Sequence, residues 1–374
     1  MIQRDECSSE ASVHRYLPRS AHSTAASGSP LHLVYLRGLQ RYVSVAEGGS
    51  LHLWASPTLE PLRTAPAAGG MVSSVFFDAV LGRLVLGTAH GRLLLYDAAT
   101  LRPQSGEKEG LRLGDVAQSL GRFDDRDSQG DAMPVSLLVG GQRGRVRLLD
   151  WAALLRGELS VVVDAAAHDG WVDQLEWQKP LNGLLSCSTD GRVVLWDLGD
   201  KKLTARHTLR NPSGRPVAGF VWVASQGLLA TRSGCERTVH LWLPGVAEPV
   251  ASLAAHPAPV THLALDEVNH QLLSRSKDCT VRVWDLRTHR CVQTLTPPEG
   301  SRRAACMLHD PEEKAVVVAE SLGQRGGIAQ HGLARNLSLS TAETATQEGD
   351  TAAVPGLPTQ GLVGLICNPA LDLV

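Results

Sequence analysis

Residues 183–197 read GLLSCSTDGRVVLWD, and this stretch indicates the fold. Two short apolar runs, 183–187 and 193–196, flank the turn Thr189-Asp190-Gly191. An Asp-Gly turn between β-prone runs is a strong signal for a β-hairpin. The stretch ends in the aromatic–acidic pair Trp196-Asp197, and a run ending in such a pair, or in a worn version of it, occurs six times along the chain.

The six runs recur at a nearly constant interval. Measured at the aromatic position, the intervals are 42, 53, 47, 46 and 42 residues. The positions concerned are Trp54, Tyr96, Leu149, Trp196, Trp242 and Trp284. A period of about 40–45 residues ending in Trp-Asp is typical of a four-stranded β-propeller blade. The sequence therefore predicts an all-β propeller of about seven blades, the last of them degenerate or incomplete.

The composition is that of an ordinary globular protein. The chain has 374 residues and is 43% hydrophobic, with 36 basic and 38 acidic residues, so no global field favours nucleic acid or anionic lipid. The seven cysteines include no C-x-x-C pair, which favours free thiols in a reducing compartment. The sequence contains neither a signal peptide nor an apolar stretch of transmembrane length. We expect a soluble, intracellular and cytoplasmic protein that does not associate with a membrane.

The domain boundaries follow from changes in composition. Residues 1–30 are rich in Ser and Ala and are expected to form a disordered or loosely packed segment. The propeller is expected at 31–322, with a charged excursion at about 102–131 that leaves the blade as a surface loop. Residues 323–361 are predicted to be a low-complexity linker. Residues 362–374 resemble the start of a further blade or second propeller, which indicates a longer chain or a multi-protein complex.

At these positions the chain resembles WD40-repeat proteins. In that family a good blade carries four hydrogen-bonded side chains: a His before the first strand, a Ser or Thr on the second, an Asp in the tight turn, and the Trp. The resemblance assigns one set to His168, Ser188, Asp190 and Trp196, and another to His256, Ser276, Asp278 and Trp284. It implies that each buried polar atom of a set has a partner. The other blades depart from the pattern and are expected to be held by packing alone.

A second resemblance covers residues 217–295. This run contains LLATRSGCERTVHLW and HQLLSRSKDCTVRVWDLRTHRCVQTL, with DGWVDQLEWQ upstream. It is similar to long cilium- and testis-associated WD-repeat proteins that carry two propellers, and it implies a place in a cytoskeletal or ciliary assembly. Some of those proteins carry an EF-hand, but this sequence has no D-x-D-x-D-G loop, so calcium binding is not implied.

The sequence contains no recognisable catalytic motif. A phosphate-binding loop, a G-x-S-x-G elbow and an H-E-x-x-H helix are all missing from it. The His–Asp–Ser sets superficially resemble a hydrolase triad, but each comes with a Trp and recurs by blade, which favours a structural network. We therefore expect a non-catalytic scaffold that binds other proteins and that needs no cofactor and no metal.

Blade geometry predicts where a partner binds. In each blade the loop before the first strand and the turn after the second point to the same rim of the ring. The candidate residues are Trp171, Asp173, Thr189, Lys277 and Arg143. Trp171 is the foremost candidate, because an exposed aromatic side chain beside a charge is typical of a binding hot spot. The alternative is that Trp171 packs over the edge of its own blade.

A nucleic-acid-associated propeller, in an RNA or ribonucleoprotein setting, is the alternative function. Arg143, Arg145 and Arg147 alternate along one predicted strand and are candidates for a basic stripe. The same alternation describes an ordinary solvated strand face, and we favour that interpretation.

Overall fold

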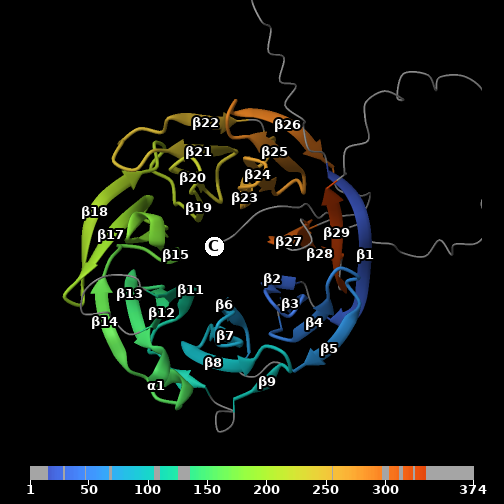
Figure 1. Cartoon of the computed structure of the whole chain (residues 1–374), viewed down its shortest axis with the longest axis vertical. Helices are drawn as coiled ribbons and strands as arrows, with labels where there is room; N and C mark the ends of the chain where they lie inside the picture. The colour runs from blue at the N-terminus through green and yellow to red at the C-terminus, as the bar shows by residue number, and fades with distance from the viewer. Residues whose placement is uncertain are drawn as a thin grey trace, which may run out of the picture.

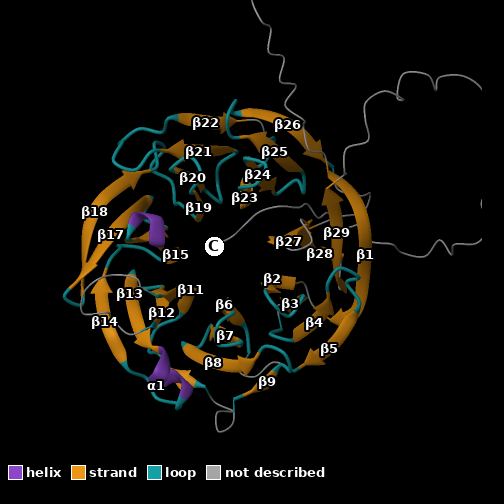
Figure 2. Cartoon of the chain, viewed as in Figure 1, coloured by secondary structure: helices purple, strands orange, loops and turns teal. Residues whose placement is uncertain are grey.

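The computed structural model describes residues 16–333, except 28–29, 47, 67–69, 105–109, 125–134, 255, 297–302, 311–314 and 323–324. Seven antiparallel sheets are arranged as a ring (Figure 1), and nearly all regular structure is β-strand (Figure 2). Each sheet is one blade, numbered here in chain order, with its first strand nearest the axis. In the part of the chain that is described, no helix is long and apolar enough to span a bilayer.

The first three blades follow one another along the chain. Blade 1 comprises β2 (Pro30–Leu36), β3 (Arg41–Ala46), β4 (Leu51–Ala55) and β5 (Pro61–Ala65). Blade 2 comprises β6 (Val72–Asp78), β7 (Arg83–Thr88) and β8 (Arg92–Asp97), with the short strands β9 (Arg102–Pro103) and β10 (Leu111–Arg112) both paired to β8. Blade 3 comprises β11 (Ala117–Phe123), β12 (Ser136–Gly141), β13 (Arg145–Asp150) and β14 (Val161–Ala166). The helix α1 (Trp151–Leu155) connects the last two of these strands.

The remaining blades complete the ring. Blade 4 comprises β15 (Val172–Gln178), β16 (Gly183–Ser188), β17 (Arg192–Gly199) and β18 (Lys202–Arg210), with the 3-10 turn η1 (Lys179–Leu181) after β15. Blade 5 comprises β19 (Gly219–Val223), β20 (Leu228–Arg232), β21 (Thr238–Trp242) and β22 (Ala251–Ala254). Blade 6 comprises β23 (Val260–Asp266), β24 (Gln271–Ser276), β25 (Val281–Asp285) and β26 (Arg290–Leu295). Blade 7 comprises β27 (Arg303–Asp310), β28 (Ala315–Leu322), β29 (Arg325–Leu333) and, as its outer strand, β1 (Tyr16–Ser27).

The hydrophobic core lies between neighbouring blades. Phe220 and Trp222 of blade 5, for example, pack in one cluster with Leu185 and Leu195 of blade 4. The strands are apolar on both faces for this reason, since each blade is covered by a neighbour on either side. Another cluster joins Tyr42 and Trp54 of blade 1 to Cys306, Leu308 and Val317 of blade 7. The ring is therefore closed by packing as well as by strand pairing.

A β-bulge recurs near the start of the first strand. In blades 2, 4 and 6 the extra residue is Ser73, Asp173 and Thr261 respectively. The residue after the bulge links two blades in places: the Gln174 side chain donates to the carbonyl of Phe220 at 3.0 Å and accepts from its N–H at 3.0 Å. A bulge re-aims a side chain, so the positions expected at the rim share one backbone geometry.

The predicted tail and linker are wrong in part, because each of these segments contains a strand. β1 lies within the segment 1–30, and β29 lies within the segment 323–361. They pair antiparallel, with Ala21 opposite Ala329, so the blade expected to be incomplete has four strands. Strand pairing uses backbone groups that any sequence offers, so a Ser- and Ala-rich segment completes a sheet without an apolar pattern. Residues 1–15 and 334–374, including the expected further blade at 362–374, lie outside the described residues.

The predicted surface loop at 102–131 is also wrong in part. β11, the first strand of blade 3, lies inside it, and its burial alternates along Ala117–Phe123. The alternation was masked in the sequence by charged neighbours and by Gly121 within the strand, since glycine is unfavourable in strands.

Candidate functional site

Blade 4 holds its aromatic residue in a hydrogen-bonded network. The Trp196 indole N–H donates to Ser186 Oγ at 2.7 Å, and Ser186 Oγ lies 2.7 Å from His168 Nε2. The other ring nitrogen, His168 Nδ1, donates to Asp190 Oδ2 at 3.0 Å. Burial alone would raise the pKa of Asp190, but hydrogen bonds from His168 and Arg192 outweigh it and hold this pKa well below its usual range. The network therefore ends in a charged carboxylate at Asp190.

Blade 6 repeats the network with a longer link. Trp284 donates to Ser274 Oγ at 2.8 Å, and Ser274 Oγ lies 2.6 Å from His256 Nε2. His256 Nδ1 lies 3.4 Å from Thr280 Oγ1, which in turn donates to Asp278 Oδ1 at 2.7 Å. Without a direct carboxylate contact, burial lowers the pKa of His256 to about 4.

In both networks the hydroxyl residue lies two positions earlier in the sequence than predicted. Ser186 and Ser274 contact the rings, whereas Ser188 accepts from the Asp190 N–H at 3.1 Å and Ser276 donates to the Ala258 carbonyl at 2.9 Å. Alternate residues of a strand share a face, so the choice between them is not fixed by strand assignment. The signal that identifies the right one is spacing, because Ser186 and Ser274 each precede their Trp by ten residues.

Blades 1 and 5, expected to be held by packing alone, keep half of this network. Trp54 donates to Ser44 Oγ at 2.9 Å, and Trp242 donates to Thr231 Oγ1 at 2.8 Å. In the loop between β18 and the first strand of blade 5, the Asn211 amide donates to Glu236 Oε2 at 3.1 Å. Asn211 and Glu236 thus take the places that His168 and Asp190 occupy in blade 4, a substitution that the search for a histidine missed.

The rim of the ring is built by one repeated backbone contact. In blade 4 the Thr189 N–H donates to the Trp171 carbonyl at 3.0 Å, and in blade 6 Lys277 does the same to Pro259 at 2.9 Å. Blades 2 and 3 have the same contact, from Ala89 to Met71 at 2.9 Å and from Gln142 to Val116 at 3.1 Å. We call this end of the ring the loop rim, defined by these four residue pairs. Trp171, Thr189 and Lys277, three of the candidate residues, are among those that define it.

Trp171 is exposed on a backbone that is held on both sides. Its side chain is 50% exposed, and its N–H donates to Thr189 Oγ1 at 2.8 Å. Next to it, Arg192 bridges Asp190 at 2.8 Å and the exposed Asp169 at 2.6 Å. An anchor on a fixed loop loses little entropy on binding, which favours a hot spot.

Arg143 lies beside this loop, in the neighbouring turn of blade 3. The carbonyl of the next residue, Gly144, accepts from the N–H groups of Ala167 and His168 at 3.0 Å each. The Arg143 side chain is exposed and makes no ion pair within the described residues. Arg145 and Arg147 instead share Asp164, at 2.7 and 3.2 Å. This pairing leaves Arg143 as the one unpaired cation of the predicted stripe.

Asp173 lies deeper than the other candidates, at the seam between blades 4 and 5. Burial raises its pKa to about 6, against the opposing charge of Arg232. A Cβ added to Gly219 would lie 2.9–3.1 Å from the Arg232 guanidinium, so this side chain crosses the start of β19. Further along β15, burial raises the pKa of Glu176 to about 8. Asp173 therefore contributes to the seam rather than to an exposed contact surface. Lys277 is exposed, but its place two blades away separates it from Trp171.

No group of three or more His, Cys, Asp or Glu side chains suited to a metal ion occurs among the residues for which the structure is given. Ser186, the hydroxyl closest to a His–Asp pair, is fully buried and already contacts both Trp196 and His168. A substrate would have no access to it, so the arrangement stabilises the blade.

A ring of four-stranded blades, each closed by a Trp–hydroxyl contact or a worn version of it, defines a β-propeller of the WD40 class. The family model described as "WD domain, G-beta repeat" matches residues 160–197 and 247–285. Each match covers the outer strand of one blade and the three inner strands of the next, and those next blades, 4 and 6, carry the two networks. The chain therefore carries WD40 repeats. The WD40 β-propeller domain of Doa1 superposes with a TM-score of 0.65 at 17% identity, over 84% of this chain and 97% of that one.

Two curated relatives carry similar segments. Zinc finger CCCH domain-containing protein 17 of Oryza sativa subsp. japonica is 45% identical over 180 residues, which is 46% of this chain and 37% of that protein. Mitochondrial division protein 1 of Schizosaccharomyces pombe is 29% identical over 154 residues, which is 36% of this chain and 23% of that protein. The chain thus matches well under half of either relative.

Proposed function

We propose that this protein is a non-catalytic scaffold that binds other proteins through the loop rim of blades 3 and 4. The observation that carries the proposal is the half-exposed Trp171 on its doubly hydrogen-bonded loop, with the unpaired Arg143 in the adjacent turn. An aromatic anchor and an arginine are the side chains most enriched in protein–protein hot spots. WD40 propellers in general serve as such scaffolds, and the buried Ser186 supports a structural use of the His–Asp pair.

The test compares two exposed apolar residues at opposite ends of the ring. Trp171→Ala should remove a set of captured partner proteins without changing the melting temperature, because half of the side chain already lies in water. Val268 is 70% exposed in the turn after β23, away from the loop rim, and Val268→Ala is the matched control. Partners lost from both variants or from neither would contradict the proposal. Adding Lys277→Ala should weaken capture further only if the partner spans several blades.

We further propose an intracellular setting, in a cytoskeletal or ciliary assembly. The cysteines support a reducing compartment, because Cys187, Cys235, Cys279, Cys291 and Cys306 form no disulfide bond among the described residues. The resemblance of residues 217–295 to cilium-associated WD-repeat proteins supports the finer assignment. Imaging of the tagged chain in ciliated cells tests it, and a signal confined to the nucleus or the secretory pathway would contradict it.

A further inference from the structure

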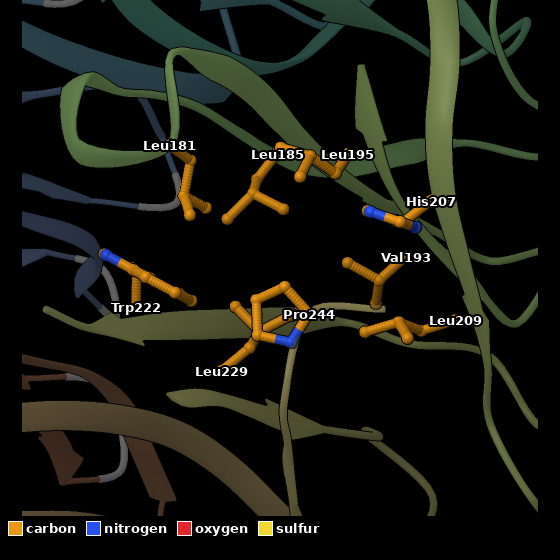
Figure 3. Close-up of a pocket in the computed structure, with 9 residues that line it drawn as sticks. All are labelled: Leu181, Leu185, Val193, Leu195, His207, Leu209, Trp222, Leu229 and Pro244. Carbon is orange, nitrogen blue, oxygen red and sulfur yellow. The ribbon is translucent and has the colours of Figure 1, made fainter. Parts of the chain in front are cut away.

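A small apolar cleft opens on the outer side of the ring, between blades 4 and 5 (Figure 3). Its lining consists of Leu181, Leu185, Val193, Leu195, His207, Leu209, Trp222, Leu229 and Pro244. The empty space is about 290 Å³ with open solvent included, and it admits little more than one water-sized group. The cleft therefore fits the end of one aliphatic side chain rather than a metabolite.

The walls of the cleft are held in place. Arg206 of β18 donates to the carbonyls of Leu181 and Asn182, at 2.8 and 3.2 Å, and so fixes the turn that carries Leu181. On the other wall, Gly245 has φ +86°, and a Cβ there would lie 3.6 Å from the His207 ring. The loop that carries Pro244 thus lies against β18. Leu243, Val246 and Val250 of this loop are 39%, 41% and 44% exposed, and they extend the apolar surface beyond the cleft.

β18 forms the edge of blade 4 next to this cleft. Among the strands that the structure describes, β18 pairs only with β17, so its outer row of backbone groups has no strand partner there (Figure 1). It has nine residues, whereas β5, β14, β22 and β26, the outer strands of four other blades, have four to six. A long open edge is a template for an added strand.

The positive charge of this edge determines which kind of added strand it favours. Lys201, Lys202 and Arg210 are exposed and make no ion pair among the residues that the structure describes. These cations would repel the β18 edge of a second copy of the chain, and they would attract an acidic segment. The one acidic side chain of β17 beside the edge, Asp197, is already paired with Arg206.

We propose that β18 binds an extended acidic segment of another protein as a fifth strand of blade 4, with one aliphatic side chain seated in the cleft. Backbone hydrogen bonds to the edge supply the affinity. The cleft fixes the register, because only one side chain of the segment can enter it. The free cations give the preference for acidic residues. This site is separate from the loop rim and does not depend on the function proposed for Trp171.

The probe is a fluorescein-labelled peptide of sequence EVDLEVD, titrated against the full chain by fluorescence anisotropy at low ionic strength. Binding is expected, together with slowed amide hydrogen exchange in residues 202–210. The charge reversal Lys202→Glu with Arg210→Glu should weaken binding by at least about tenfold, since it turns two attractions into repulsions. A circular dichroism spectrum equal to wild type will show that this variant is folded.

Matched controls distinguish the contribution of the cleft to binding from that of charge, and binding at the β18 edge from binding at the loop rim. The peptide KVKLKVK should not bind, and EVDGEVD, which lacks only the central leucine, should bind more weakly than EVDLEVD. Trp171→Ala with Lys277→Ala should bind EVDLEVD as well as wild type does. The proposal is overturned if wild type does not bind EVDLEVD, if the charge reversal has no effect, or if protection appears at the loop rim instead of β18.

Discussion

At the scale of single residues, two aspartates in equivalent turns accept hydrogen bonds from different groups. Asp190 accepts from His168 at 3.0 Å, from the Asp169 N–H at 3.1 Å and from Arg192 at 2.8 Å. Asp278 accepts from the backbone and side chain of Thr280, at 3.0 and 2.7 Å. Asp190→Ala leaves a buried imidazole without its carboxylate acceptor and removes one of the two carboxylate partners of Arg192, whereas Asp278→Ala affects only groups of a partly exposed threonine.

We therefore expect Asp190→Ala to lower the free energy of unfolding by about 2–3 kcal/mol, and Asp278→Ala by about 1 kcal/mol. Chemical denaturation of the two variants in parallel measures the difference. Equal losses would mean that the direct His168 contact adds nothing beyond a turn hydrogen bond.

At the scale of elements, the strands that carry the Trp repeat could be predicted, and those without it could not. β16 agrees with the expected run 183–187 within one residue, and β17 contains the expected run 193–196, because apolar runs and an Asp-centred turn mark both strands. The sequence did not predict β11, because charged neighbours and Gly121 hide its alternation. It did not predict β1 either, since an outer strand that pairs through backbone groups needs no apolar pattern of its own. In the candidate site, Trp171 and Thr189 follow from strand register, but the depth of Asp173 depends on the neighbouring blade and is not encoded in β15.

The seam between blades 4 and 5 makes stability depend on pH. Burial raises the pKa of Glu176 from its ordinary 4.5 to about 8, so the folded state holds its proton more tightly and stability falls as pH rises between these values. Asp173, at about 6, acts in the same direction but has finished titrating by about pH 7. His256, lowered to about 4, acts in the opposite direction and only below about pH 6.5. Above pH 6.5 the dependence therefore comes mainly from Glu176.

Glu176→Gln should remove this loss. Between pH 6.5 and 8 the wild-type chain should lose about 2 kcal/mol relative to Glu176→Gln, seen as melting temperatures that diverge with rising pH. Glu158→Gln is the control, because that side chain is 66% exposed and should follow wild type. Parallel curves for wild type and Glu176→Gln would show that Glu176 is ionised in the fold.

At the scale of the whole molecule, the ring is closed by segments from its two distant ends. β1 supplies the outer strand of blade 7 and pairs with β29 over Tyr16–Ser27, while β27 and β28 follow blade 6 along the chain. The repeat count alone predicted the number of blades, but it could not predict which segment closes the last one. Closure of a ring by its first and last segments couples all blades, since opening at one seam exposes the edge of the next.

A chain that begins at Pro30 lacks β1 and leaves the nine-residue edge of β29 open. We expect its melting temperature to fall by at least about 5 °C relative to a chain that begins at Tyr16, because a paired strand costs several kcal/mol to remove. Adding a synthetic peptide of residues 16–27 in excess should restore part of the loss, since it binds only the folded ring and thereby stabilises it. A peptide of the same composition in scrambled order is the control, because it offers backbone groups without the register of Ala21 opposite Ala329. If the two truncated chains melt together, β1 does not close the ring, and the seventh blade holds with three strands.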